Sequence, residues 1–330
     1  TAVADEDHLP ALTLDLVDPH ERAVERVDEL HVAAGRVRHF DVDGRQDAAF
    51  AIWIGAEADD CEGQDAEPST FGHLLLVYAS QLRRCVQRLE RVLTEDLSEG
   101  RISGSVGTYS VLSPEIEKIS LAELGLVPAV VETQVLQRDR HASLVANLAI
   151  TARAISQIAR TFHTKMRSKY KELREPRAKG QKGSSAMAHK RNPHKIESLL
   201  GLARKVSSLV GPALENMELM DWRDISHSSV ERDILPEVTG YVHYMAFTMS
   251  NIVQNLEAFP ENMQRNLDNA LGLWASQAVR TSLLERGVPP AVAYAHVQDC
   301  SFAAEDTGIH LLVLLGDKCL PGTTDSVPDL

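Results

Sequence analysis

Several residue types that mark specialised proteins are scarce in this chain of 330 residues. Its four cysteines (Cys61, Cys85, Cys300 and Cys319) lie too far apart for a zinc motif or a disulfide framework, so we expect a reducing, cytoplasmic compartment and no metal. Aromatic residues make up only 5%, which argues against a stacking surface for single-stranded nucleic acid. We find no signal peptide and no apolar run of the length that spans a bilayer.

Positive charge is also in deficit. The chain has 34 Lys and Arg against 47 Asp and Glu, which gives a net charge of −13. Such a protein has no general attraction for nucleic acid or for an anionic membrane, so any anion site must be local. The remaining composition, 44% hydrophobic and 25% charged, is typical of a soluble globular protein.

Residues 1–62 differ in composition from the rest of the chain. They contain no Lys, Ser, Asn, Met or Tyr, and they show no sustained hydrophobic period. We therefore predict an aberrant segment over 1–62, a central helical domain over 63–255, and a C-terminal helical region over 256–330 whose pattern fades at the tail.

Helical periodicity dominates from residue 70 onward. Apolar residues recur every three or four positions in four long stretches, which predicts amphipathic helices packed as an all-α bundle. These stretches are 71–93, 142–166, 196–214 and 238–256. Between them, residues 99–117 and 218–236 are rich in glycine, serine or charge, as loops that carry sites often are.

The stretch "KGQKGSSAMAHKRNPHKIE" (179–197) combines small hydroxyl residues with strong positive charge. Ser184 lies beside Gly183, where free backbone N–H groups can stabilise an alkoxide. Lys190 supplies positive charge, Asn192 an amide donor, and Glu197 a carboxylate able to orient Lys190 or a histidine. This set suits removal of a proton next to a carboxylate. The alternative is a plain solvent-exposed loop; the spacing of a phosphate-binding P-loop is absent.

"GSSAMAHKRNPHKIE" resembles the signature of the fumarase/aspartase superfamily. The stretches "DAEPSTFG" (65–72), "GRISGSVGTY" (100–109), "TQVLQRDRHA" (133–142), "RDISHSSVERDILP" (223–236) and "FPENMQRNLDNALGL" (259–273) resemble the adenylosuccinate lyase family within it, in the same order. The resemblance implies a helical homotetramer whose active sites each draw on three chains. It implies release of fumarate from adenylosuccinate, and the same cleavage of the succinyl-carboxamide intermediate (SAICAR) of purine synthesis, without metal or organic cofactor.

The resemblance also implies residue roles. Ser184 corresponds to the general base, Lys190 and Asn192 to the groups that hold the succinyl carboxylates, and Glu197 to a supporting carboxylate. Gln134 and Ser185 correspond to substrate contacts. Three residues correspond to the phosphate site: Arg223, Ser228 and Arg232. From the residues alone, the two arginines form either a phosphate clamp or surface ion pairs with Asp224 and Glu231.

Three positions depart from the family pattern. Ala188 replaces the signature proline, Trp222 replaces an acidic residue, and Glu62 occupies the place of the general-acid histidine. Since an ordinary glutamate is ionised at neutral pH, we expect an impaired lyase.

Residues 1–62 themselves are consistent with translation in a shifted reading frame or with a diverged first domain. The competing functions are another fumarate-releasing lyase, which the phosphate clamp argues against, and a catalytically inactive scaffold of the same fold.

Overall fold

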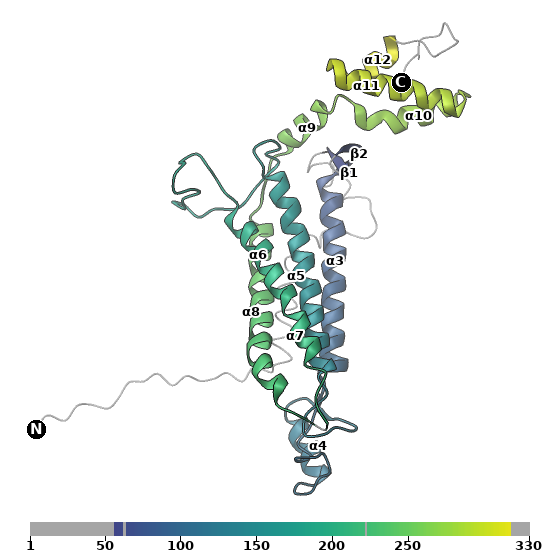
Figure 1. The fold of residues 1–330 in the computed structure, drawn as a ribbon. Helices are drawn as coiled ribbons and strands as arrows, with labels where there is room; N and C mark the ends of the chain where they lie inside the picture. Colours follow the sequence, from purple (N-terminus) through teal and green to yellow (C-terminus); the bar gives the residue numbers. More distant parts are fainter. Residues whose placement is uncertain (1–55, 62–63, 222, 318–330) are drawn as a thin grey trace, which may run out of the picture.

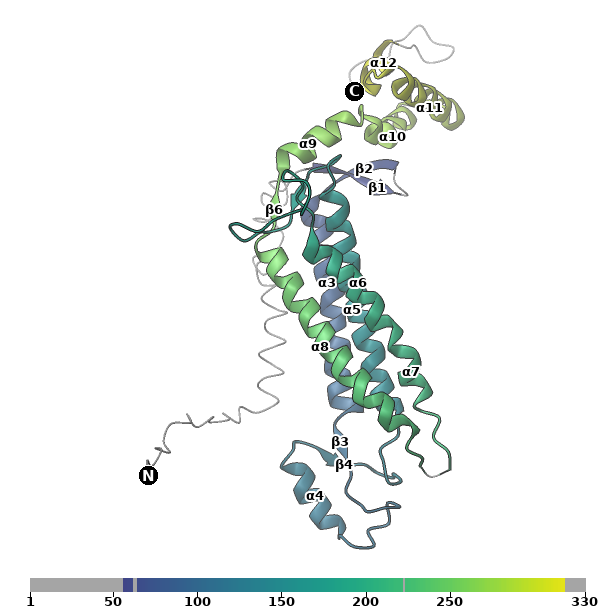
Figure 2. The same cartoon turned by 60° about the vertical axis from the view of Figure 1, so that its left-hand side comes forward.

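The computed structural model describes residues 56–61, 64–221 and 223–317. Its main body is an elongated bundle of five helices (Figures 1 and 2). They are α3 (Phe71–Arg91), α5 (Asp139–Lys165), α6 (His194–Ser208), α7 (Val210–Glu215) and α8 (Ser226–Gln254). The all-α bundle predicted from the periodicity is confirmed.

The central helix of the bundle is α5, which contacts α3, α6, α7 and α8. Most residues of the predicted apolar stripes are buried or partly buried in one core cluster, which α5 shares with its neighbours. By length and composition α5 could also cross a membrane, but 61% of its most apolar window is buried inside the protein, as in the core helix of a soluble protein. The largest fully buried side chains of the bundle are Phe71, Ile155, Phe162, Ile196, Leu199, Met245 and Ile252.

Local signals in the sequence account for where these helices begin and end. The Thr70 hydroxyl accepts the His73 N–H at 3.1 Å and caps α3. His163 and Lys165 lie in the last turn of α5, where positive charge complements the helix dipole. The third predicted stripe is interrupted at Leu209, so that it forms α6 and α7 rather than one helix.

The end of the bundle at the start of α5 carries a small lobe. It contains a π-helical turn (Val92–Asp96), β3 (Glu99–Gly100), α4 (Pro114–Ala122) and β4 (Val127–Pro128). The parallel β3–β4 pair joins the segment before α4 to the segment after it. Figure 2 shows α4 beyond the ends of the long helices.

The opposite end carries two short antiparallel pairs and the C-terminal helices. β1 (Ala56–Cys61) pairs with β2 (Gln64–Thr70), and β5 (Leu173–Arg174) with β6 (Glu257–Ala258). α9 (Pro260–Asn269) and a 3₁₀ turn (Leu273–Ala275) lead to α10 (Ser276–Glu285), α11 (Pro290–Thr307) and α12 (Leu311–Asp317). These last helices bury a separate small core around Leu283, Cys300 and Leu311.

The predicted division into three domains stays a prediction. Residues 1–55 lie outside the described part of the chain, and so does residue 62, the proposed boundary, between β1 and β2.

Candidate active site

The predicted site residues fall at the two opposite ends of the bundle. The loop 176–193, hereafter the signature loop, precedes α6 at the end where α5 finishes (Figure 1). Gln134 and Arg223 lie at the other end, just before α5 and α8 begin. α5 runs between the two ends with 27 residues, a length of ~40 Å at 1.5 Å per residue. Within one chain, therefore, the two groups cannot act on one small molecule.

Ser184 lies within a tight turn of the signature loop. Its Oγ accepts the backbone N–H groups of Ala186 at 3.4 Å and Met187 at 3.2 Å. Donors aimed at a serine oxygen favour its alkoxide form, which a base that removes a carbon-bound proton requires. The sequence predicted free N–H groups around Gly183 and Ser185, whereas the two donors in the structure belong to Ala186 and Met187.

The neck of the signature loop is fixed where it joins α6. Glu175, 3% exposed, accepts the N–H of Lys195 at 3.3 Å and of Ile196 at 3.0 Å. This carboxylate therefore satisfies donors at the positive end of the helix. The loop tip is open to solvent, with Ser185, Ala188 and Lys190 exposed and Asn192 partly buried.

Glu197 lies in the first turn of α6 and contacts α5. Its Oε1 lies 3.5 Å from His163 Nε2, with half of the glutamate side chain exposed. Of the two partners that the sequence allowed for Glu197, the structure shows a histidine. This pair links the end of α5 to the helix that carries the signature loop.

At the other end, three of the quoted stretches meet around a pocket of about 350 Å³. Arg223 donates from Nη1 to Gln134 Oε1. Because a guanidinium has donors only, this bond turns the amide oxygen toward the arginine and leaves the Gln134 Nε2 hydrogens for another acceptor. The pocket therefore offers the Arg223 guanidinium and the Gln134 amide hydrogens to an anion, with Asp224 as the one carboxylate in its lining. It is lined by Ser105, Val106, Thr133, Gln134, Arg223, Asp224 and Ile225.

Asp224 does not form an ion pair with Arg223 that would neutralise the charge of the guanidinium. Its two oxygens accept the N–H groups of Met220 and Ser226, each at 2.6 Å. The Ser226 side chain first, and then these two N–H groups, lower the pKa of Asp224 to about 2. Within the described residues Arg223 makes no ion pair with Asp224. The predicted ion-pair alternative is therefore wrong for Arg223.

The predicted pair between Arg232 and Glu231 is also missing from the described residues, because Glu231 instead faces Arg138, with Oε1 3.1 Å from Nε. Arg232 is exposed and Ser228 partly buried, both in the first two turns of α8. The three clamp residues thus lie at one end of α8, but only Arg223 is in the lining of the pocket.

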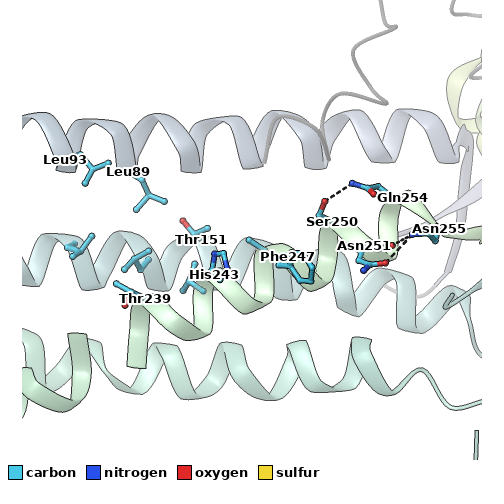
Figure 3. Close-up of a pocket in the computed structure, with 14 residues that line it drawn as sticks. Leu89, Leu93, Thr151, Thr239, His243, Phe247, Ser250, Asn251, Gln254 and Asn255 are labelled. Carbon is cyan, nitrogen blue, oxygen red and sulfur yellow. Dashed lines mark hydrogen bonds between the residues drawn. The ribbon is translucent and has the colours of Figure 1, made fainter. Parts of the chain in front are cut away.

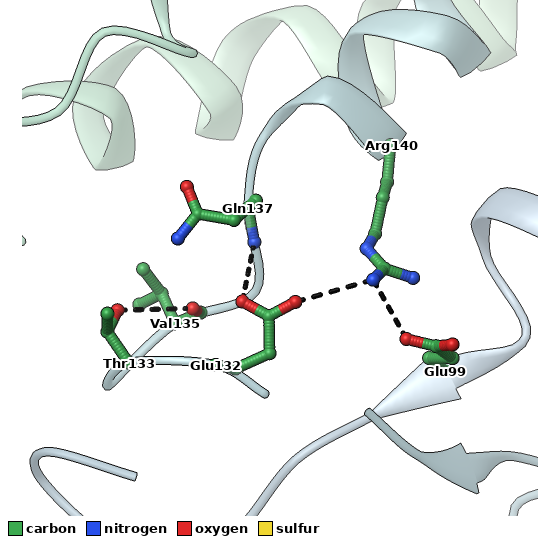
Figure 4. A network of polar contacts seen from close by, with 6 residues as sticks. All are labelled: Glu99, Glu132, Thr133, Val135, Gln137 and Arg140. Carbon is green, nitrogen blue, oxygen red and sulfur yellow. Dashed lines mark hydrogen bonds and ion pairs between the residues drawn. The ribbon is translucent and has the colours of Figure 1, made fainter. Parts of the chain in front are cut away.

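The segment that carries Gln134 is held by charged groups (Figure 4). Glu132 accepts the Gln137 N–H at 3.2 Å and contacts Arg140 at 3.3 Å, and Arg140 in turn lies 2.8 Å from Glu99. These contacts join the start of α5 to β3 and so hold in place the segment that carries Gln134.

A second network shapes the glycine-rich loop 100–109. Arg101 donates to the carbonyls of Gln134 and Gly104. Glu117, 1% exposed, accepts the Ile102 N–H at 2.5 Å and the Tyr109 hydroxyl. The latter bond raises the pKa of Tyr109. Gly107 has φ of +73°, and its backbone lies against the Glu132 carbonyl, where a side chain would have no room.

Two predicted positions have no described geometry. Glu62, in the place of the general-acid histidine, lies outside the described residues, and Trp222 does too.

Comparison with known proteins identifies the family. The sequence matches the Lyase family over residues 61–208. It is 44% identical over 253 residues to the adenylosuccinate lyase of Thermotoga maritima, covering 77% of this chain and 58% of that protein. It is 39% identical over 297 residues to the adenylosuccinate lyase of Synechocystis, covering 90% and 66%. This chain belongs to the fumarase/aspartase superfamily of lyases.

Solved structures show the superfamily fold. The 3-carboxy-cis,cis-muconate lactonizing enzyme of Pseudomonas putida superposes with a TM-score of 0.76 at 25% identity, over 91% of this chain and 65% of that one. A fumarate lyase of Mesorhizobium gives 0.75 at 22% identity, over 90% and 64%. This lyase chain spans 58% of the Thermotoga protein and 54% of the adenylosuccinate lyase of Bacillus subtilis, to which it is 45% identical over 236 residues, 72% of this chain.

Proposed function

We propose that this chain contributes both halves of an adenylosuccinate lyase site, which releases fumarate from adenylosuccinate to leave AMP and performs the same cleavage on the succinyl-carboxamide ribonucleotide. The observation that carries the proposal is the pairing, in one chain similar to adenylosuccinate lyases, of a serine held by backbone donors with a separate pocket lined by Arg223 and Gln134. The serine loop supports carbon-proton removal, and the pocket with Arg232 supports phosphate binding.

The reaction then divides into two steps. Ser184 as alkoxide takes the proton from the succinyl carbon next to a carboxylate, whose electrons move into an enediolate that Lys190 and Asn192 stabilise. The electron pair then forms the carbon–carbon double bond of fumarate while the bond to the purine amino nitrogen breaks. That nitrogen takes a proton from a general acid.

The separation of the two halves supports sites shared between chains, and we propose a homotetramer. A groove of about 670 Å³ along α3, α5 and α8 carries apolar side chains (Figure 3). On it Phe247 is 59% exposed and Leu93 47%. Large apolar side chains in such a groove are typical of surfaces that another chain covers. Light scattering should show a tetramer, Phe247→Glu should dissociate it, and a monodisperse monomer would rule out the shared site.

The residue at the general-acid position favours a second candidate, a scaffold that binds nucleotide without turnover. Glu62 replaces histidine there. A positioned general acid typically contributes about 10²–10⁴-fold to the rate. We therefore expect slow turnover by this chain and a gain from Glu62→His.

The test follows adenylosuccinate absorbance and AMP binding by calorimetry in parallel. Slow turnover that Ser184→Ala abolishes supports the lyase. AMP binding without turnover, even in Glu62→His, identifies the scaffold. Absence of both refutes the proposed function.

A further inference from the structure

We propose that Arg177 is a positioning residue that closes the neck of the signature loop and holds the Ser184 turn in its reactive geometry. This inference rests on the proposed function for its catalytic meaning, although its structural part is independent of any substrate. Nothing in the sequence pattern singled out Arg177, which lies seven residues before Ser184.

The guanidinium lies between the two flanks of the loop. Its Nη2 donates to the Asn192 carbonyl at 3.1 Å. On the other flank it packs against Gly183, where a Cβ atom would lie only 2.5 Å from Nη1 and 2.7 Å from Nη2. The residue before the base serine and the backbone of a substrate-binding asparagine thus meet on one side chain.

Two further contacts close the same neck. The Lys190 carbonyl approaches Gly183 so closely that no side chain would fit, and a His194 ring nitrogen lies 3.1 Å from the Gly183 carbonyl. Three groups therefore contact Gly183: the Arg177 guanidinium, the Lys190 carbonyl and the His194 ring. The Ser184 turn begins at the next residue, so a movement of Gly183 displaces the serine oxygen from the N–H groups that it accepts.

The chemistry of arginine suits this place. Its planar fork can donate to a carbonyl while both terminal nitrogens lie against a glycine, which the single ammonium of lysine cannot do. Arg177 is partly buried, whereas Lys179, Lys182 and Arg191 are exposed. Within the described residues no carboxylate pairs with Arg177. Its positive charge therefore remains available to favour an alkoxide on Ser184.

The experiment replaces Ser184 by cysteine as a chemical reporter, because a thiolate responds to the same donors and charge. Iodoacetamide alkylation of that peptide, followed by mass spectrometry against pH, reports the thiol pKa. Hydrogen exchange of the amides in 183–192 reports closure of the neck. Both are measured in the oligomeric protein for Arg177→Met, Arg177→Lys and the matched control Arg191→Met, with exchange in α5 and α6 as a check of folding.

We expect Arg177→Met to speed exchange in the neck about tenfold or more and to shift the alkylation profile to higher pH, while Arg191→Met leaves exchange unchanged. Arg177→Lys keeps the positive charge, so its alkylation profile should shift less than that of Arg177→Met, but its amides in 183–192 should exchange as fast as those of Arg177→Met. Unchanged exchange in Arg177→Met, or equal effects in Arg191→Met, would overturn the proposal. A protein in which Arg177→Met loosens the neck as expected, but which neither binds AMP nor cleaves adenylosuccinate, would refute the proposed function alone.

Discussion

The bond between Arg223 and Gln134 predicts that the two residues bind a ligand as one unit. If Arg223 fixes the amide so that Nε2 faces the pocket, removing either side chain disables both. We therefore expect Arg223→Met and Gln134→Met to weaken AMP binding by similar amounts. The double variant should lose little more than either single variant.

The magnitude follows from the geometry. A hydrogen bond to a charged group contributes ~1.5–3 kcal/mol. Gln134 is exposed and Arg223 only partly buried, so the lower end applies because water screens the contact. A loss of ~1.5 kcal/mol corresponds to about tenfold in Kd. The coupling between the two substitutions should be of nearly the same size.

Calorimetric titration with AMP measures this as a double-mutant cycle. The control cycle pairs Gln134→Met with Arg232→Met, since Arg232 has no hydrogen bond to Gln134 in the described part of the chain. Additive losses are expected in the control. Additive losses in the Arg223 cycle as well would refute the shared donor array.

Four other predictions test separate parts of the structure. Arg232→Ala should weaken AMP binding about tenfold, while exposed Arg204→Ala should not; Arg138 is a poor comparison because it faces Glu231 beside the clamp. Gly183→Ala should speed amide exchange at Met187, because the new Cβ atom has no room. By contrast, Gly201 lies in α6 with open space around it, so Gly201→Ala should raise the free energy of unfolding in urea by roughly 0.5–1 kcal/mol. Burial, and then the Arg138 charge, lowers the pKa of His141 from 6.5. The unfolded chain therefore binds a proton that the folded chain does not, so the free energy of unfolding should fall as the pH drops below 6.5. Thermal melts at successive pH values should show a smaller pH dependence for His141→Gln. Finally, in the Glu62→His background, Ser184→Ala should abolish turnover and Arg232→Ala should reduce it, and unfolding and refolding the two variants together should raise turnover above that of either alone. No such gain would show that both halves act within one chain.

The helices were predictable because their signal is local. Apolar residues at a period of three to four place α3 and α5 within a few residues of their observed bounds. The start of α8 was predicted wrongly: the helix begins at Ser226 and includes Pro236, so it covers most of the segment 218–236 that the sequence indicated as a loop. The break between α6 and α7 at Leu209 could not be predicted, because the apolar stripe continues through it. Exposure of Leu93 and Leu214, both counted in predicted core stripes, depends on neighbours that periodicity does not specify.

The candidate site was predictable only as a set of residue types. The sequence predicted that Glu197 could orient a histidine but not which one, because the pairing with His163 depends on how α5 packs against α6. Arg101 lies in a quoted stretch, yet its role depends on carbonyls of Gly104 and Gln134 that only the fold brings near. Arg177 had no signal at all, since a basic residue near a basic loop is unremarked until its partners are known.

The position of the two half-sites at opposite ends of one stiff bundle gives each chain a polarity. In the shared site that we propose, an end of one kind meets an end of the other kind, which neighbouring bundles achieve when they lie side by side and run antiparallel. A two-fold axis perpendicular to the bundles creates that arrangement in one step and repeats every contact it makes. Under this proposal the shared sites arise in pairs, and a dimer of antiparallel bundles has two of them or none.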